Sequence, residues 1–452
     1  MLRHPLLRRI VPQVRRDLSE TYARNLHKWL LIAPIIGLSV GLVITLVATL
    51  ILRLLWPPVL RFYLAHPWTM LPGITLGCAG AGLLMQKLTP NPNQHSTEEI
   101  IHAYHEEDGV VDTRPLPAKL AAAVATVGFG GSAALEGPSI YGGAAIGSWF
   151  FHRLGSLRRF RLTPRDRRIM LICGAAAGMS AVFRAPLTGI VFALEMPYKD
   201  DMAHEALLPS LLASVVSYFT LGTFLGSAPL FDFPAAAGYS MHDLVWSALL
   251  GLAIGLLATA YVLTFRHLRG RVVRSAQPHW LKLAIGGALT AMCGLAFLAL
   301  YPGRLVPIGP NYEAVSAVIS QPHGSVQLVA FAALKLAATA FTLGAGGVSA
   351  MFVPIFLSGG ALGVAFSQSV VHSPAIALYA AVGMASFIAA AYKTPLAAAV
   401  FVAEATGGHA FLIPALIGAA VAYSVSGDAS ISADQRLHEG PRQRLNTAAA
   451  DD

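Results

Sequence analysis

A single glutamate in a long apolar stretch is the first residue that could do chemistry. Glu136 is flanked by segments without Lys, Arg, Asp or Glu back to Lys119 and forward to Arg153. If this stretch lies inside a membrane, a carboxylate there costs about 2.5–3.5 kcal/mol and is a functional candidate by default. Pro138 suits the start of a helix, whose first backbone N–H groups have no partners within the helix. We predict that these N–H groups attract an anion, which is either Glu136 itself or a competing solute.

That competition describes a gate. The carboxylate of Glu136 occupies the site when it is charged and leaves it when it is protonated or displaced. The plainer alternative is that Glu136 only caps the N-terminus of a helix. Only the gate makes transport depend on the charge of this residue.

Residues 344–354 form a second candidate site. The segment reads GAGGVSAMFVP, in which three glycines allow the backbone to leave the helical conformation and Pro354 restarts a helix. The N–H groups of Met351, Phe352 and Val353 are expected to precede that helix and to be free to face an ion. The alternative is a flexible linker without a ligand.

The chain also contains an internal repeat. Residues 184–195 read RAPLTGIVFALE and residues 393–404 read KTPLAAAVFVAE, and their matching proline, leucine, valine, phenylalanine and glutamate keep a constant offset of 209 residues. The matched glutamates, Glu195 and Glu404, are interpreted as helix-end caps or members of structural ion pairs.

A weaker repeat surrounds the two candidate sites. Residues 136–147 (EGPSIYGGAAIG) resemble residues 352–363 (FVPIFLSGGALG), in the same order relative to the stronger repeat. Two halves of similar design, each with a broken helix, are typical of transporters whose site lies between the halves. The sequence leaves open whether the halves are inverted relative to each other.

The composition places these elements in a membrane. Hydrophobic residues make up 55% of the 452 residues, and charged residues make up 12%, about half the share of ~25% in soluble domains. Such a chain cannot cover a soluble globule with polar side chains. The composition therefore excludes an ordinary cytosolic enzyme, a disordered protein and a nucleic-acid-binding domain.

Basic residues are clustered in three segments, 1–28, 153–168 and 266–282, each beside an apolar span. Because basic loops stay on the cytoplasmic side during insertion, we predict that the three segments share that side and that the N-terminus is cytoplasmic. Nucleic-acid binding is the rival interpretation of these clusters. The first 28 residues lack an apolar core, so no cleaved signal peptide is expected.

We expect one all-α membrane domain. The longest charge-free run, residues 336–392, could hold two or three spans, and its glycines and prolines indicate short broken helices that line a cavity. The expected segments are a basic cytoplasmic N-terminal segment (1–28), the membrane domain (29–427) with repeat halves at about 70–230 and 283–427, and a short polar tail (428–452).

These motifs resemble those of the CLC family of chloride channels and chloride/proton antiporters. The tripeptide EGP at 136–138 matches the family motif G-[KR]-E-G-P, and AMFVP at 350–354 matches G-x-F-x-P. GAAAGMSAVFRAPLTGIVFALE (174–195) and TPLAAAVFVAEATG (394–407) match the segments that follow these motifs in the family. The resemblance covers roughly residues 70–435.

The resemblance implies a CLC-type fold of two repeated halves, expected to be inverted, with broken half-length helices and without regulatory cytoplasmic domains. It also implies a homodimer with one pathway per subunit. Glu136 resembles the external gating glutamate. The amides of Met351 and Phe352 resemble the central anion site, and those around Glu136 and Gly137, with Phe352 and Val353, resemble the outer site.

Four positions depart from the family pattern, the first being Leu135, which stands where the family has an arginine or lysine before the gating glutamate. The first family motif, G-S-G-I-P, whose serine binds the central ion, is absent; His95 or Ser96 could take the serine's place, or the segment is an ordinary polar loop. The C-terminal tyrosine that closes the inner side is expected to be replaced by Ser432, which would leave a wider entrance. Met196 stands where antiporters usually carry a glutamate that relays protons.

We therefore expect chloride, or another small monovalent anion, to move through a pathway gated by Glu136. Since the last two departures favour uncoupled movement, a channel-like or loosely coupled mode is preferred. The alternative is a chloride/proton antiporter with a substitute relay at His95, Glu98 or Glu99. An alternative of another class is a proton-coupled cation transporter in which Glu136 binds the cation.

No enzymatic activity, cofactor or metal is expected. An intramembrane enzyme would need a nucleophile or a metal cluster, and no pair of histidines one helical turn apart occurs around His372 or His409. The three cysteines lie in apolar segments and have no metal-binding spacing. The expected partners are chloride, possible protons, the lipid of a prokaryotic inner (plasma) membrane and a second copy of the chain, with no nucleic acid.

Overall fold

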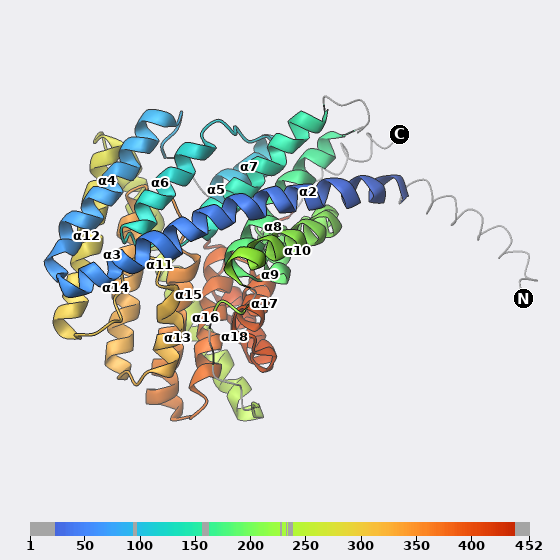
Figure 1. Ribbon diagram of the computed structural model, residues 1–452. Helices are drawn as coiled ribbons and strands as arrows, with labels where there is room; N and C mark the ends of the chain where they lie inside the picture. The colour runs from blue at the N-terminus through green and yellow to red at the C-terminus, as the bar shows by residue number, and fades with distance from the viewer. Residues whose placement is uncertain are drawn as a thin grey trace, which may run out of the picture.

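The protein is helical throughout the part that the structure describes. The computed structural model describes residues 23–93, 97–155, 162–226, 228–231, 233 and 238–438, and within these ranges there are two isolated β-bridges but no strand. Among the described residues, seven helices are long and apolar enough to cross a membrane. The prediction of an all-α polytopic membrane protein is therefore confirmed (Figure 1).

The helices fall into two halves, which we call the first half (α2–α10) and the second half (α11–α18). The helices of the first half are α2 (Ala23–Ala48), α3 (Trp56–Ala65), α4 (Met70–Leu88), α5 (Thr97–Glu106), α6 (Leu116–Gly128), α7 (Glu136–Gly155), α8 (Pro164–Phe183), α9 (Pro186–Glu195) and α10 (Leu207–Leu225). Those of the second half are α11 (Met241–Arg274), α12 (His279–Leu300), α13 (Tyr312–Ser320), α14 (Ser325–Gly344), α15 (Phe352–Phe366), α16 (Ile376–Tyr392), α17 (Pro395–Thr406) and α18 (Leu412–Val425). Short 3₁₀ turns (Pro67–Thr69, His204–Ala206, His409–Phe411) and π-helical turns (Thr49–Leu55, Ser367–Val371) join or extend them.

Several apolar stretches are broken into short helices, as expected. The stretch at 120–150 divides into α6 and α7, and the stretch at 169–195 divides into α8 and α9. The charge-free run at 336–392 holds the C-terminal part of α14 and all of α15 and α16. The breaks place helix ends inside the protein, where they can face a site instead of lipid.

The helices that carry the two motifs begin in the same way. We expected Pro138 and Pro354 to open their helices, but each proline is the third residue of its helix, α7 or α15. The first helical hydrogen bonds run from Ser139 N to Leu135 O (3.0 Å) and from Ile355 N to Met351 O (3.0 Å). The physical reason is that the first-turn N–H groups have no partner within a helix, so a proline at the third position removes no hydrogen bond.

Two helix pairs form the centre of the molecule, α7 with α8 and α15 with α16. Helices α8 and α16 are buried along almost their whole lengths. The backbones touch at glycines: a Cβ on Gly174 would lie 2.0 Å from the carbonyl oxygen of Gly143, and one on Gly383 would lie 2.2 Å from that of Gly359. The repeat seen in the sequence is thus a repeat of one close helix crossing, with small residues at the contact.

The two halves run in opposite directions where they meet. Glu195, at the end of α9, accepts hydrogen bonds from the N–H groups of Leu396 (3.2 Å) and Ala397 (2.8 Å) at the start of α17. Glu404, near the end of α17, accepts from the N–H groups of Leu187 (3.0 Å) and Thr188 (2.6 Å) at the start of α9. Each glutamate therefore caps the antiparallel partner helix, and the prediction of helix-end caps is confirmed.

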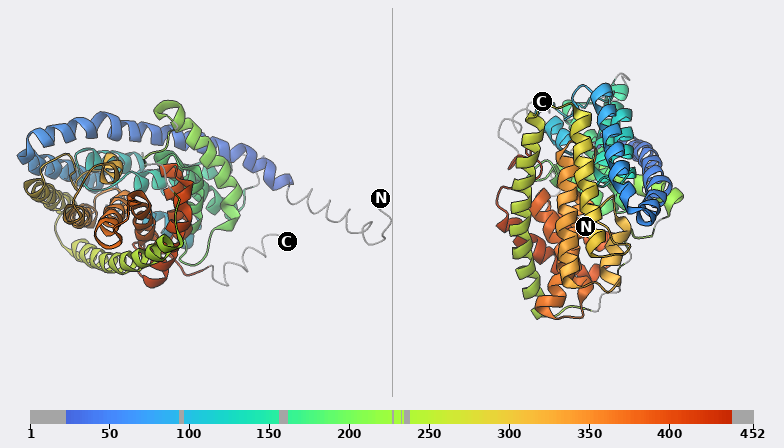
Figure 2. Two further views of the ribbon diagram at one scale, coloured as in Figure 1. Left: turned by 90° about the horizontal axis from the view of Figure 1, so that it is seen from below. Right: turned by 90° about the vertical axis from the view of Figure 1, so that its left-hand side faces the viewer.

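Long helices enclose this centre from both sides. Helix α2 packs against α7, α8 and α10, whereas α11 packs against α14, α16 and α18. Seen along the bundle, α2 and α11 lie on opposite sides of the molecule (Figure 2). The motif-bearing helices are therefore held in a rigid, enclosed setting.

The glycine crossing gives a testable prediction for stability. Gly174→Ala should destabilise the protein by about 1–3 kcal/mol, because the added methyl group cannot fit against the Gly143 carbonyl. Gly80→Ala, in α4, is the control, since a Cβ there meets no atom within 4 Å. Thermal unfolding of the purified proteins in detergent should show a lower Tm for the first variant only. Equal Tm values for both variants would contradict this packing.

Candidate anion-binding site

The two motifs meet at the centre of the molecule. The loops before α7 and α15 pair as an antiparallel bridge, in which Ala134 N donates to Ala350 O at 3.0 Å. The hydroxyl of Ser349 also donates to the carbonyl oxygen of Ala134. These bonds place the N-termini of α7 and α15 side by side, so the positive ends of two helix dipoles converge.

The Glu136 carboxylate lies at this convergence. Its side chain is buried (1% exposed), and Oε1 accepts a hydrogen bond from the N–H of Phe352 at 2.5 Å. Oε2 has no hydrogen-bond partner among the described residues. The carboxylate therefore binds one of the N–H groups that the sequence predicted for an anion.

Four aromatic rings hold Phe352 in place. Its ring centroid lies 5.2 Å from Phe183, 5.6 Å from Phe192, 5.0 Å from Phe401 and 5.6 Å from Tyr392. The four rings form two pairs at the repeat offset of 209 residues, Phe183 with Tyr392 and Phe192 with Phe401. Such contacts fix the side chain of Phe352 and, with it, the direction of the N–H that Glu136 accepts.

Tyr392, at the end of α16, packs its ring against that of Phe352. The side chain of Gln435 fixes the end of α16 by donating to the carbonyl oxygens of Tyr392 (3.0 Å) and Met196 (2.9 Å).

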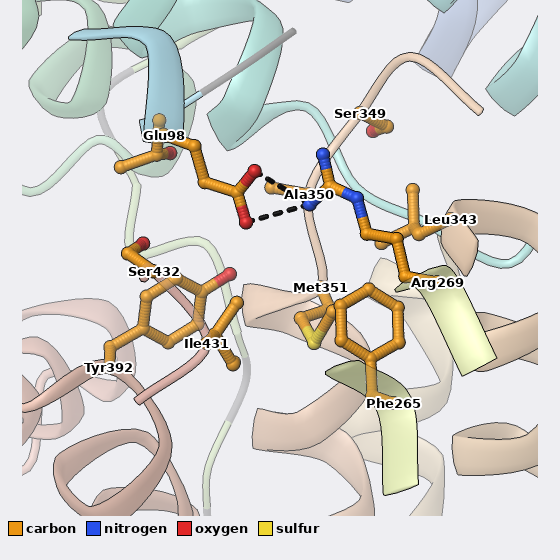
Figure 3. Close-up of a pocket in the computed structure, with 11 residues that line it drawn as sticks. Glu98, Phe265, Arg269, Leu343, Ser349, Ala350, Met351, Tyr392, Ile431 and Ser432 are labelled. Atoms are coloured by element: carbon orange, nitrogen blue, oxygen red, sulfur yellow. Dashed lines mark hydrogen bonds and ion pairs between the residues drawn. The ribbon is translucent and has the colours of Figure 1, made fainter. Parts of the chain in front are cut away.

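A small pocket of ≈ 40 Å³ lies beside Tyr392 (Figure 3). It is large enough for a water or a small ion, since one water needs about 10–15 Å³ by the same measure. The pocket is lined by Thr97, Glu98, Phe265, Arg269, Leu343, Ser349, Ala350, Met351, Tyr392, Ile431 and Ser432. Met351 lines this pocket, whereas Glu136 and Phe352 do not.

The structure brings most of the predicted site residues together. Glu136, Gly137, Phe352 and Val353 are buried where α7 and α15 begin, and Met351 and Ser432 line the pocket. His95 and Ser96 lie outside the described residues.

The pocket also contains a tyrosine that the sequence analysis did not single out. Ser432 is buried and lines the pocket together with Tyr392, and the wider entrance expected from Ser432 stays a prediction. Tyr392 comes from α16, not from the C-terminal segment that contains Ser432. Its position at the repeat offset from Phe183 was the signal that could have revealed it.

Two further pocket residues were missed. Thr97 follows directly after Ser96, is 5% exposed, and its hydroxyl has no hydrogen-bond partner among the described residues. Arg269 reaches the pocket from the far end of α11, where it pairs with Glu98. No sequence pattern links α5 to α11, so only the tertiary fold reveals that Arg269 reaches this pocket.

Comparison with known proteins finds relatives in sequence and in structure. An H(+)/Cl(-) exchange transporter ClcA from Yersinia pestis is 28% identical over 341 residues, which cover 74% of this chain and 70% of that protein. The crystal structure of a CLC-type fluoride/proton antiporter covers 92% of this chain and 98% of its own, with a TM-score of 0.77 and 24% identity. A slow cyanobacterial Cl-/H+ antiporter gives a TM-score of 0.76 with 20% identity over 93% of this chain and 98% of its own.

The two structural similarities show the same fold, and the sequence match extends across most of the chain. Residues 75–427 match the family described as "Voltage gated chloride channel". These residues contain both motifs, both glycine crossings and the capped helices α9 and α17. The chain belongs to the voltage-gated chloride channel (CLC) family of anion-transporting membrane proteins.

Proposed function

We propose that the protein carries chloride, or another small monovalent anion, across the membrane through a pathway gated by Glu136. The observation that carries this proposal is the 2.5 Å hydrogen bond between Glu136 Oε1 and the N–H of Phe352. A carboxylate oxygen on that N–H stands where a chloride would bind, so the glutamate and the solute exclude each other. Backbone amides suit a transported anion because they bind it without holding it irreversibly.

The groups around Glu136 favour an anion over a cation. The group facing the Glu136 carboxylate is an N–H donor at the positive end of α15. A cation site would need several oxygen ligands around the same carboxylate. The proton-coupled cation transporter is therefore the weaker alternative.

We further propose that chloride movement is coupled to protons. Two contacts that could act as barriers support this: Glu136 binds the N–H of Phe352, and Tyr392, which lines the pocket, packs against the ring of Phe352. Exchange needs barriers on both sides of a site, whereas a channel must open both at once. The Yersinia relative is named as an exchange transporter. The channel-like mode favoured by Met196 and Ser432 stays a prediction, and a channel-like mode would overturn this part of the proposal.

We also propose a membrane location, an orientation and an oligomeric state for the protein. The basic segments beside the spans support an inner (plasma) membrane location with a cytoplasmic N-terminus. Resemblance to the family supports a homodimer with one pathway per subunit. Chloride, protons and lipid are then the partners of the chain.

The gate is tested with Glu136→Gln. Chloride flux into liposomes containing this variant should persist at neutral pH and lose most of its pH dependence, because glutamine has the shape of the protonated acid but cannot ionise. Glu106→Gln is the control, as Glu106 is an exposed residue on α5 that does not line the pocket. An unchanged pH response in Glu136→Gln would show that Glu136 is only a helix cap.

Selectivity is tested with ion substitution. Since the ligands are backbone amides, Met351→Leu should leave chloride flux largely intact, and sodium or potassium should not be carried. The measurement is radioactive chloride and sodium uptake by the purified, reconstituted protein. Sodium uptake without chloride uptake would rule out the anion assignment.

Coupling is tested with a gradient. In sealed liposomes, an imposed chloride gradient should drive protons uphill at a constant ratio, because an exchanger moves the two ions in one cycle. The measurement is the proton-to-chloride ratio from simultaneous pH and chloride electrodes. Chloride movement without uphill proton movement would establish the channel-like mode.

A further inference from the structure

We propose that Glu98 is the inner proton acceptor of this protein and takes protons from solution toward Glu136; the inference rests on the coupled exchange proposed above. Coupling requires a second protonatable group on the pocket side of the anion site, because proton transfer across an apolar gap is slow. Met196, which stands at the usual relay position, is buried and cannot carry a proton. Another residue must therefore accept the proton on this side.

The other glutamates of the central helices are occupied elsewhere. Glu195 accepts hydrogen bonds from the start of α17, and Glu404 from the start of α9. Neither residue lines the pocket beside Tyr392. Glu98 is the one carboxylate among the described residues that line it.

Glu98 and Glu136 lie near consecutive residues of a single turn. Glu136 binds the N–H of Phe352, and the preceding residue, Met351, lines the pocket together with Glu98 and Tyr392. Figure 3 shows the Glu98 carboxylate directed into the pocket from α5, with Tyr392 and Met351 among the residues around it.

Glu98 also contacts the solution side. A second, more open cavity of ≈ 320 Å³ is lined by Glu98 together with Arg266, Arg269 and Arg274 of α11. The two cavities share Glu98, Phe265, Arg269 and Ile431, so Glu98 stands at their junction. Three arginines at this mouth raise the local concentration of anions.

The ion pair with Arg269 explains how Glu98 is held. The guanidinium Nη1 lies 2.7 Å from Oε1 and 2.6 Å from Oε2 of Glu98, and Nη2 donates to the carbonyl oxygen of Asn93 at 3.4 Å. The side chains are 20% and 27% exposed for Arg269 and Glu98. The pair is thus tied down but within reach of water, which can deliver a proton.

The proton transfer needs only water and the two carboxyl groups. Water delivers a proton to Glu98, whose neutral carboxyl group weakens the pair with Arg269 and frees the guanidinium to attract a chloride. Water in the pocket then passes the proton on, so that Glu98 becomes a carboxylate again and Glu136 becomes a neutral acid. Neutral Glu136 no longer competes for the N–H of Phe352, which a chloride can then occupy.

The charged and titratable groups that face Glu98 come from two elements. Arg266, Arg269 and Arg274 belong to α11, and Tyr392 belongs to α16. The neighbouring Glu99 lines a different cavity and pairs with Lys119. Glu98 is therefore the residue of α5 that links the mouth to the anion site.

The test uses the full-length protein in liposomes, with protons carried per chloride as the readout. Glu98→Gln should lower this ratio by about 10-fold or more while chloride still moves, because glutamine keeps the shape but not the proton. Glu98→Asp should restore most of the ratio. Glu106→Gln is the matched control, since Glu106 is also a glutamate of α5 paired with an arginine, Arg436, and its ratio should equal that of the wild type.

Arg269→Gln separates proton transfer from the ion pair. This variant keeps the Glu98 carboxyl group, so the ratio should stay near that of the wild type while chloride uptake slows. If Glu98→Gln alone does not fold because it leaves Arg269 unpaired, the double variant with Arg269→Gln carries the same test.

Three outcomes overturn the proposal, and they can be told apart. A wild type that moves chloride without protons contradicts the coupled exchange itself. A wild type that pumps protons together with an unchanged ratio in Glu98→Gln contradicts the relay alone. Loss of coupling in Arg269→Gln equal to that in Glu98→Gln would mean that the pair only supports the structure.

Discussion

The hydrogen bond from the Phe352 N–H to the Glu136 carboxylate is the interaction on which the rest of the structure depends. A buried carboxylate at membrane depth needs donors, and here the donor is the first N–H of a helix. In the function proposed above, a chloride binds the same N–H once the carboxylate has left it. One bond would then satisfy the charge of the glutamate and block the anion, and any group that protonates Glu136 would control the site.

The contacts repeated in the two halves hold the two groups of that hydrogen bond in place. Glycine crossings bring the backbones of α7 and α8, and of α15 and α16, into direct contact, which fixes the starts of α7 and α15. The rings of two repeat-related aromatic pairs enclose Phe352, and reciprocal glutamate caps join α9 to α17. Each device occurs once in each half, so two halves that run in opposite directions bring two helix N-termini to one point.

The sequence predicted the parts of the site that depend on local pattern. Glu136 and Phe352 could be recognised because a charge in an apolar run and a glycine-rich break before a proline each have a direct physical meaning. The pocket could not be predicted, because Tyr392, Thr97 and Arg269 come from three helices that only the tertiary fold brings together. Ser432 lines the same pocket, but the tyrosine beside it is supplied by α16 and not by the C-terminal segment. The repeat offset was the one long-range signal in the sequence, and it relates Tyr392 to Phe183.

The most direct measurement of the central claim is a pair of crystal structures, of the wild type and of Glu136→Gln, both in bromide at neutral pH. Anomalous scattering from bromide locates the anion without ambiguity. In the wild type, the Glu136 carboxylate should stay on the Phe352 N–H and exclude bromide from it. In the variant, the uncharged side chain should leave and bromide should lie within hydrogen-bond distance of that N–H. Bromide absent from the Phe352 N–H in the variant, with the glutamine still bound there, would contradict the competition between Glu136 and the anion.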